Sequence, residues 1–137
     1  MTHPSYDPKK ILVVDNDVDL LMLLERTLNN EGYWVETAAT LEEAGRLLHQ
    51  FNPDLILLDV NINGQDGRYF CGKIKMGGLG SKVKVVLMSA YEYNTIRSSL
   101  FGADDFLAKP FSSEFILFKV QQHLLHLNTQ LTASEQV

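Results

Sequence analysis

Five short apolar runs, separated by amphipathic segments, are the feature that most constrains the fold of this chain. Three of the runs are almost continuously hydrophobic, as in strands of a parallel sheet that is covered on both faces. We therefore expect each run to form a strand. The runs are ILVV (11–14), WVETA (34–38), LILL (55–58), VKVVLM (83–88) and DFLA (105–108).

The segments between these runs carry helix signals. In residues 18–31, leucines at helical spacing form one apolar face, with Asp17 as the expected N-cap and Gly32 as the stop. Thr40, with Glu43 three residues later, forms a capping box for a second helix. Further helices are expected near 67–76, near 91–101 and after Pro110.

A strand followed by a helix, five times over, predicts an α/β fold with a parallel sheet and right-handed crossovers. The length of 137 residues favours a single domain. We expect that domain to span residues 9–128, after an N-terminal extension at 1–8 and before a polar tail or linker start at 129–137.

Composition excludes several classes of protein. The net charge of -5 gives no support for nucleic-acid binding. Cys71 is the single cysteine, so an internal disulfide is ruled out and a reducing compartment fits best. No apolar run approaches the ~18 residues of a membrane helix, and the start of the chain has no secretory apolar region. We expect a cytoplasmic protein that binds neither membranes nor nucleic acid directly.

The ends of the strands carry the polar residues of interest. In open α/β sheets, ligands bind outside the carboxyl ends of the strands, where the strand order reverses. If the order is 2-1-3-4-5 in a doubly wound sheet, strands one and three are neighbours at that point. Asp15 and Asp59 then share one crevice, with Ser89 and Lys109 beside them.

A lone aspartate after a strand is usually a turn or cap residue. The combination indicates chemistry, because two carboxylates held close together repel each other and lose hydration, and so need a cation. Oxygen ligands in a loop crevice suit Mg²⁺. A nearby hydroxyl and ammonium could hold the oxygens of a phosphoryl group. The residues therefore predict an Mg²⁺ and phosphoryl site.

Four motifs resemble the receiver domain of bacterial two-component response regulators, the CheY-like superfamily. The resemblance covers about residues 9–128, and it implies a flavodoxin-like (βα)5 sheet of order 2-1-3-4-5. The motifs fall in the order and spacing of that family. They are ILVVDN, PDLILLDVNINGQDG, VVLMSA and GADDFLAKPF.

The resemblance implies a role for each site residue. Asp59 would be the phosphoacceptor, and Asp15, Asn16, Asp59 and the backbone carbonyl of Asn61 would bind Mg²⁺. The phosphoryl donor would be a sensor histidine kinase or a phosphotransfer protein. Such a domain is not an enzyme on other substrates, since it catalyses only its own phosphorylation and dephosphorylation.

The remaining implied roles concern signalling. Ser89 would hydrogen-bond the phosphoryl group, Lys109 would pair with it, and Phe106 would be the aromatic switch that moves with Ser89. The Lys109–Pro110 peptide bond would be cis, a conformation that has a low free-energy cost only before proline. The surface formed by the fourth helix, fifth strand and fifth helix would then change. An output domain, a downstream protein or a second copy of the chain would bind the changed surface.

Two positions depart from the family pattern. Asn16 stands where the second acid of the pair is usually aspartate, so we expect weaker Mg²⁺ binding and slower phosphorylation. Asn63 replaces the proline of the usual Met-Pro-Gly, which removes a rigid element from the loop.

Three alternatives stay open. A receiver-like interaction module that is never phosphorylated would fit the loss of charge at Asn16. A phosphatase of the haloacid dehalogenase type would fit Asp15-Asn16-Asp17 and Ser89, but it places its lysine earlier and leaves Asp59 unexplained. A flavin-binding domain would need a loop rich in Ser, Thr and Gly after the first strand. The sequence names neither the kinase nor the output, and it does not show whether the receiver stands alone.

Overall fold

A five-stranded parallel sheet forms the centre of the protein. The computed structural model describes residues 7–77, 82–90 and 101–135, with side chains up to residue 124. The strand order is β2-β1-β3-β6-β7, which in the chain order of these five strands is 2-1-3-4-5 and confirms the expected doubly wound sheet. The strands are β1 (Lys10–Val14), β2 (Trp34–Ala38), β3 (Leu55–Asp59), β6 (Lys84–Ser89) and β7 (Asp105–Ala108).

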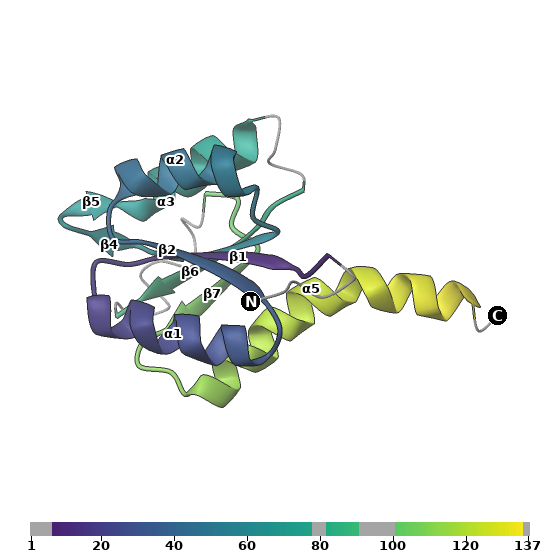
Figure 1. Ribbon diagram of the computed structural model, residues 1–137. Coiled ribbons are helices and arrows are strands. Elements are labelled where there is room, and N and C mark those ends of the chain that lie inside the picture. Colours follow the sequence, from purple (N-terminus) through teal and green to yellow (C-terminus); the bar gives the residue numbers. More distant parts are fainter. Residues whose placement is uncertain (1–6, 78–81, 91–100, 136–137) are drawn as a thin grey trace.

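Helices cover both faces of this sheet. Helices α2 (Leu41–Phe51) and α3 (Gly67–Met76) lie on one face, and α1 (Val18–Asn30) and α5 (Ser113–Glu135) lie on the other (Figure 1). Of the helix expected near 91–101, residues 91–100 lie outside the described residues. Helix α5 continues to Glu135, across most of the segment expected to be a polar tail. In the described part of the chain, no helix is long and apolar enough to span a membrane.

The helix starts follow the predicted capping residues. The Asp17 side chain accepts a hydrogen bond from the Leu20 amide at 3.2 Å, and Thr40 accepts one from the Glu43 amide at 3.1 Å. Each cap satisfies an amide that has no partner within its helix. The caps therefore fix where α1 begins after β1 and where α2 begins after β2. The loops at the carboxyl ends of these strands are held in place as a result.

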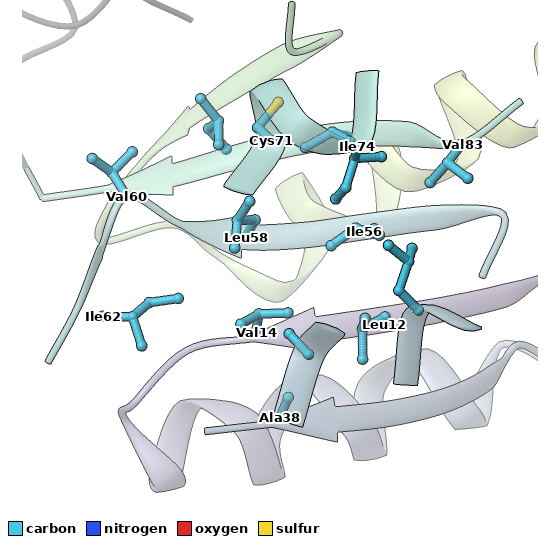
Figure 2. Packing of buried hydrophobic residues seen from close by; sticks show 14 of the residues in the cluster. Leu12, Val14, Ala38, Ile56, Leu58, Val60, Ile62, Cys71, Ile74 and Val83 are labelled. Atoms are coloured by element: carbon cyan, nitrogen blue, oxygen red, sulfur yellow. The ribbon is translucent and has the colours of Figure 1, made fainter. Parts of the chain in front are cut away.

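The core has one layer on each side of the sheet. Successive strand residues face opposite sides, so Leu12 and Val14 pack toward α2 and α3, whereas Ile11 and Val13 pack toward α1 and α5. Figure 2 shows the first of these clusters, in which residues of β1 and β3 pack with Cys71 and Ile74 of α3. Burial of each such large side chain contributes roughly 1.5–3 kcal/mol. The strands are thus held rigidly up to their carboxyl ends.

A small hairpin follows β3 that the apolar pattern did not predict. Strands β4 (Asn61–Ile62) and β5 (Gln65–Asp66) pair antiparallel around Asn63 and Gly64. Those two residues have φ of 53° and 82°, the positive values that a type I′ hairpin turn requires. Proline, with φ near −65°, cannot occupy the first of these positions. The missing proline is therefore replaced by an ordered hairpin rather than by an unsupported loop.

Candidate phosphoacceptor and metal site

The carboxyl edge of the sheet brings together the side chains predicted from the strand ends. Asp15 follows β1, Asp59 ends β3, Ser89 ends β6 and Lys109 follows β7. Asp15, Asp59 and Ser89 are 0%, 7% and 1% exposed, and among the described residues they are the buried polar or charged side chains. Buried polar groups cost free energy unless they are paired. The clustering of these three side chains at one edge of the sheet therefore indicates a functional site.

Lys109 bridges the two carboxylates. Its Nζ lies 2.5 Å from Oδ2 of Asp15 and 3.4 Å from Oδ2 of Asp59. Its backbone amide donates to the Ser89 carbonyl at 2.8 Å, which ties the ends of β6 and β7 together. The Lys109–Pro110 peptide bond is cis, as predicted. One ammonium therefore offsets part of the repulsion between two buried acids.

The electrostatic environment of Asp59 suits a nucleophile. Burial raises the pKa of Asp59, the nearby Asp15 charge raises it further, and Lys109 opposes both, so that the pKa remains above its ordinary value. Burial alone would lower the pKa of Lys109, but its hydrogen bond to Asp15 and the charges of both carboxylates outweigh that effect and raise it. Lys109 is thus held in its charged form beside a carboxylate that is more basic than usual.

Backbone contacts fix the two carboxylates in place. The amide of Asp17 donates to Oδ1 of Asp15 at 2.9 Å, and the amide of Asn61 donates to Oδ1 of Asp59 at 3.3 Å. Gly67, at the start of α3, packs directly behind Asp59. A Cβ atom at Gly67 would lie 2.1 Å from the Asp59 backbone oxygen, so no larger residue fits without moving the strand end.

The predicted metal ligands form an all-oxygen set. Asp15 and Asp59 supply carboxylates, and Asn61, two residues after the end of β3, begins the hairpin strand β4. Asn16 is exposed, and its Nδ2 donates to Oδ1 of Asn63 at 3.3 Å. In the described ranges, no group of three or more His, Cys, Asp or Glu side chains is placed to hold a metal ion. Two carboxylates, an amide oxygen and a backbone carbonyl still fit Mg²⁺, which takes few protein ligands and keeps several waters.

The switch residues predicted from the sequence are both buried. Phe106 lies in β7, 7% exposed, with Leu87 as its register partner in β6. Ser89, in the same pair of strands, pairs with Ala108. Ser89 and Phe106 thus lie on neighbouring strands two register positions apart, and their switching role stays a prediction.

An ion-pair cluster on the outer edge of β7 was not anticipated from the sequence. Asp105 Oδ2 lies 3.1 Å from Nζ of Lys119 and 2.8 Å from Nε2 of His123. Burial alone would raise the pKa of Asp105, but hydrogen bonds from His123, the Phe106 amide and Lys119 outweigh it and hold the pKa below its ordinary value. The cluster joins α5 to the strand that carries Phe106.

The hairpin pairing and the contacts of its residues are the other part of the site that the sequence motifs did not reveal. Asn63 contacts Asn16, and Asp66 caps α3 while its carboxylate binds the Arg68 guanidinium. The signal that could have revealed the hairpin is the Asn-Gly pair at 63–64, a strong indicator of a two-residue turn.

Comparison with known proteins agrees with this geometry. The family model for the response regulator receiver domain matches residues 11–121, and the chain belongs to that family. Among curated proteins, the alkaline phosphatase synthesis transcriptional regulatory protein PhoP of Bacillus subtilis is 33% identical over 127 residues, which are 93% of this chain and 53% of that protein. The probable transcriptional regulator ycf27 of Guillardia theta is 33% identical over 122 residues, 88% of this chain and 47% of that protein. The chain thus spans about half the length of the curated relatives it matches.

Solved structures show the same fold. The CheY-like response regulator receiver domain protein of Methanospirillum hungatei aligns with a TM-score of 0.80 at 28% identity, covering 90% of this chain and 99% of that one. The response regulator protein TrrA of Thermotoga maritima, solved in complex with Mg²⁺ and BeF, aligns with a TM-score of 0.74 at 33% identity, covering 84% and 98%. The chain is a response regulator receiver domain of the two-component class, with the CheY-like fold.

Proposed function

We propose that Asp59 accepts a phosphoryl group from a histidine kinase or phosphotransfer protein and that the domain then signals through its β7–α5 side. The observation that carries this proposal is the contact of one lysine, Lys109, with two buried carboxylates at the ends of neighbouring strands. A structural ion pair needs one acid. A second buried acid within reach of the same ammonium is costly unless it serves chemistry.

In the proposed reaction, a carboxylate oxygen of Asp59 attacks the phosphorus of a phosphohistidine. The new O–P bond forms as the N–P bond breaks, and the electron pair leaves with the imidazole of the donor. The product carries roughly -1.5 to -2 charges on its phosphoryl group. Lys109, whose Nζ is 3.4 Å from Asp59 Oδ2, offsets part of that charge.

Asp15, Asn16, Asp59 and the carbonyl of Asn61 would hold Mg²⁺ in this domain. When bound, the cation supplies positive charge next to the transferred phosphoryl group. The donor set supports this, as does the Mg²⁺ and BeF complex of the related TrrA protein. The amide at Asn16 supplies no charge, so the affinity is expected to be lower than with an acid at that position.

Phosphorylation would bias the domain between two existing states. The hydroxyl of Ser89 would move toward the phosphoryl oxygens, and Phe106 would turn into the space that it leaves. Strand β7 and helix α5 would then present a changed surface to an output domain, a downstream protein or a second copy. Catalysis would remain confined to the domain's own phosphorylation and dephosphorylation.

One rival function keeps a specific observation in its favour. Asn16 removes a charge from the metal site, as expected for a receiver-like interaction module that is not phosphorylated. The phosphatase alternative is weaker, because Asp17, the second acid of its motif, is engaged as the helix cap at Leu20.

The deciding experiment is incubation with Mg²⁺ and a small acyl phosphate, followed by intact-mass measurement. The wild type should gain one phosphoryl group, and Asp59→Asn should gain none. Asp19→Asn is the matched control, since Asp19 lies exposed in the first turn of α1 and should leave the adduct unchanged. A wild type without an adduct would favour the unphosphorylated module, and an adduct that survives in Asp59→Asn would exclude Asp59 as the acceptor.

A further inference from the structure

The two positions at which the chain departs from the family pattern touch each other. Nδ2 of Asn16 donates a hydrogen bond to Oδ1 of Asn63 at 3.3 Å, between residues 47 apart in the sequence. Asn16 lies in the loop after β1, and Asn63 lies in the turn between β4 and β5. The contact therefore links the two loops that border Asp15 and Asp59.

The hairpin holds Asn63 at this place. Its φ of 53° and that of 82° at Gly64 form the turn, and the Gly64 amide donates to Oδ1 of Asn61 at 3.1 Å. Ile62, fully buried, anchors the hairpin in the core beside β1 and β3. Asparagine is among the few residues that adopt positive φ readily, and it also brings a side-chain acceptor. The position thus combines a backbone requirement with a polar contact.

An amide at position 16 creates a problem that a carboxylate does not have. Both oxygens of an aspartate can ligate a cation, whereas an asparagine has one oxygen and one NH₂ group, and the NH₂ group cannot ligate. Rotation of the amide by half a turn would therefore exchange a ligand for a repelling dipole. A hydrogen-bond acceptor that engages the NH₂ group removes this ambiguity, as outer partners of metal ligands do elsewhere.

We propose that Asn63 is a positioning residue for the divalent cation site: by accepting from Nδ2 of Asn16, it keeps Oδ1 of Asn16 as the atom that serves a cation held with Asp15 and Asp59. This inference rests on the proposed function, because it assumes that Mg²⁺ binds at this edge of the sheet. It adds that the departures at positions 16 and 63 act as a pair.

The test is an Mg²⁺ titration of ¹⁵N-labelled protein followed by backbone amide shifts. Asn63→Gly removes the acceptor and keeps a residue that tolerates the positive φ of the turn. It should weaken Mg²⁺ binding by about threefold to tenfold, the range of one neutral hydrogen bond. The same change in an Asn16→Asp background should alter affinity by less than about twofold, since a carboxylate needs no orientation. Gln65→Ala, an exposed change in the same hairpin, is the matched control and should have no effect.

A second signal comes from the metal-free protein. The side-chain NH₂ resonances of Asn16 should be shifted from those of exposed asparagines in the wild type and should return to ordinary values in Asn63→Gly. Unchanged affinity in Asn63→Gly, or equal losses in both backgrounds, would overturn the positioning role while leaving the receiver function intact. If the wild type shows no Mg²⁺-dependent shifts, the metal part of the proposed function fails and this inference fails with it.

Discussion

Asn16→Asp is expected to change the metal-bound and the metal-free protein in opposite directions. In the metal-free site, the Lys109 ammonium faces the carboxylates of Asp15 and Asp59, so the three groups sum to one negative charge. A third carboxylate makes that sum two. The variant should therefore be less stable than the wild type without metal and should bind Mg²⁺ more tightly.

The exposure of Asn16 sets the size of the effect. Two unit charges about 4 Å apart interact by about 1 kcal/mol in water, and the exposed side chain justifies the water-like value. Mg²⁺ carries two charges, so the added carboxylate should contribute about 2 kcal/mol, or roughly thirtyfold in affinity, before salt is considered. Screening at physiological ionic strength lowers this to about tenfold. The metal-free penalty should stay below about 1 kcal/mol.

Two measurements check this prediction. Urea unfolding with a chelator present should show Asn16→Asp to be the less stable protein. The same experiment at rising Mg²⁺ should reverse the order, because a ligand at free concentration c stabilises the folded state by RT ln(1 + c/Kd), which is larger for the tighter-binding protein. Asn29→Asp adds the same charge at the exposed end of α1 and, as the control, should leave the Mg²⁺ dependence of stability unchanged. Equal Mg²⁺ affinities in wild type and Asn16→Asp would refute the reasoning, since position 16 would then not face the cation.

Two further changes test other parts of the structure. Gly67→Ala would place a Cβ 2.1 Å from the Asp59 backbone oxygen and should lower the free energy of unfolding by about 1–3 kcal/mol and slow phosphorylation; a variant with wild-type urea stability would contradict that contact. The pKa of Asp105 is held below its unfolded value, so its contribution is present above about pH 4 and is lost as the pH falls through the lowered pKa. Asp105→Asn should therefore cost at most about 1 kcal/mol at neutral pH and nothing in strong acid, because the cluster with His123 is partly exposed. A pH-independent difference in stability between Asp105→Asn and wild type would show that the ionised carboxylate is not its source.

The sheet could be predicted from sequence because buried parallel strands consist of apolar residues on both faces. The run at 11–14 appears as β1 (Lys10–Val14), which starts one residue earlier, and the run at 83–88 appears as β6 (Lys84–Ser89), shifted by one residue. The β4–β5 hairpin could not be predicted from the hydrophobic pattern, because strands of two residues are too short to show a periodicity. The sequence does carry a turn signal, the Asn-Gly pair at 63–64, but the resemblance to the family directs attention to the missing proline instead.

The residues that form the site could be predicted from the sequence, but the contacts between them could not. Strand ends place Asp15, Asp59, Ser89 and Lys109 at one edge, and the structure brings them together there. That Lys109 lies closer to Asp15 than to Asp59 depends on how the lysine side chain packs, which no motif encodes. The bond between Asn16 and Asn63 likewise joins residues 47 apart through a hairpin that the pattern did not reveal.

The charges at the site also indicate how an amide at position 16 would be compatible with the proposed phosphorylation. Before transfer, Lys109 offsets one of two carboxylates, so the site is tolerable without a cation. After the proposed transfer, the phosphoryl group would bring roughly -1.5 to -2 charges, and it would do so beside Asp15 but not beside a second acid. Asn16 therefore weakens attraction for Mg²⁺ and also removes one source of repulsion toward the incoming group. It follows that the wild type should need more Mg²⁺ than Asn16→Asp to reach half-maximal phosphorylation, while both reach a similar extent at saturation. An adduct that stays far lower in the wild type at saturating Mg²⁺ would place the effect of Asn16 in the transfer itself rather than in metal binding.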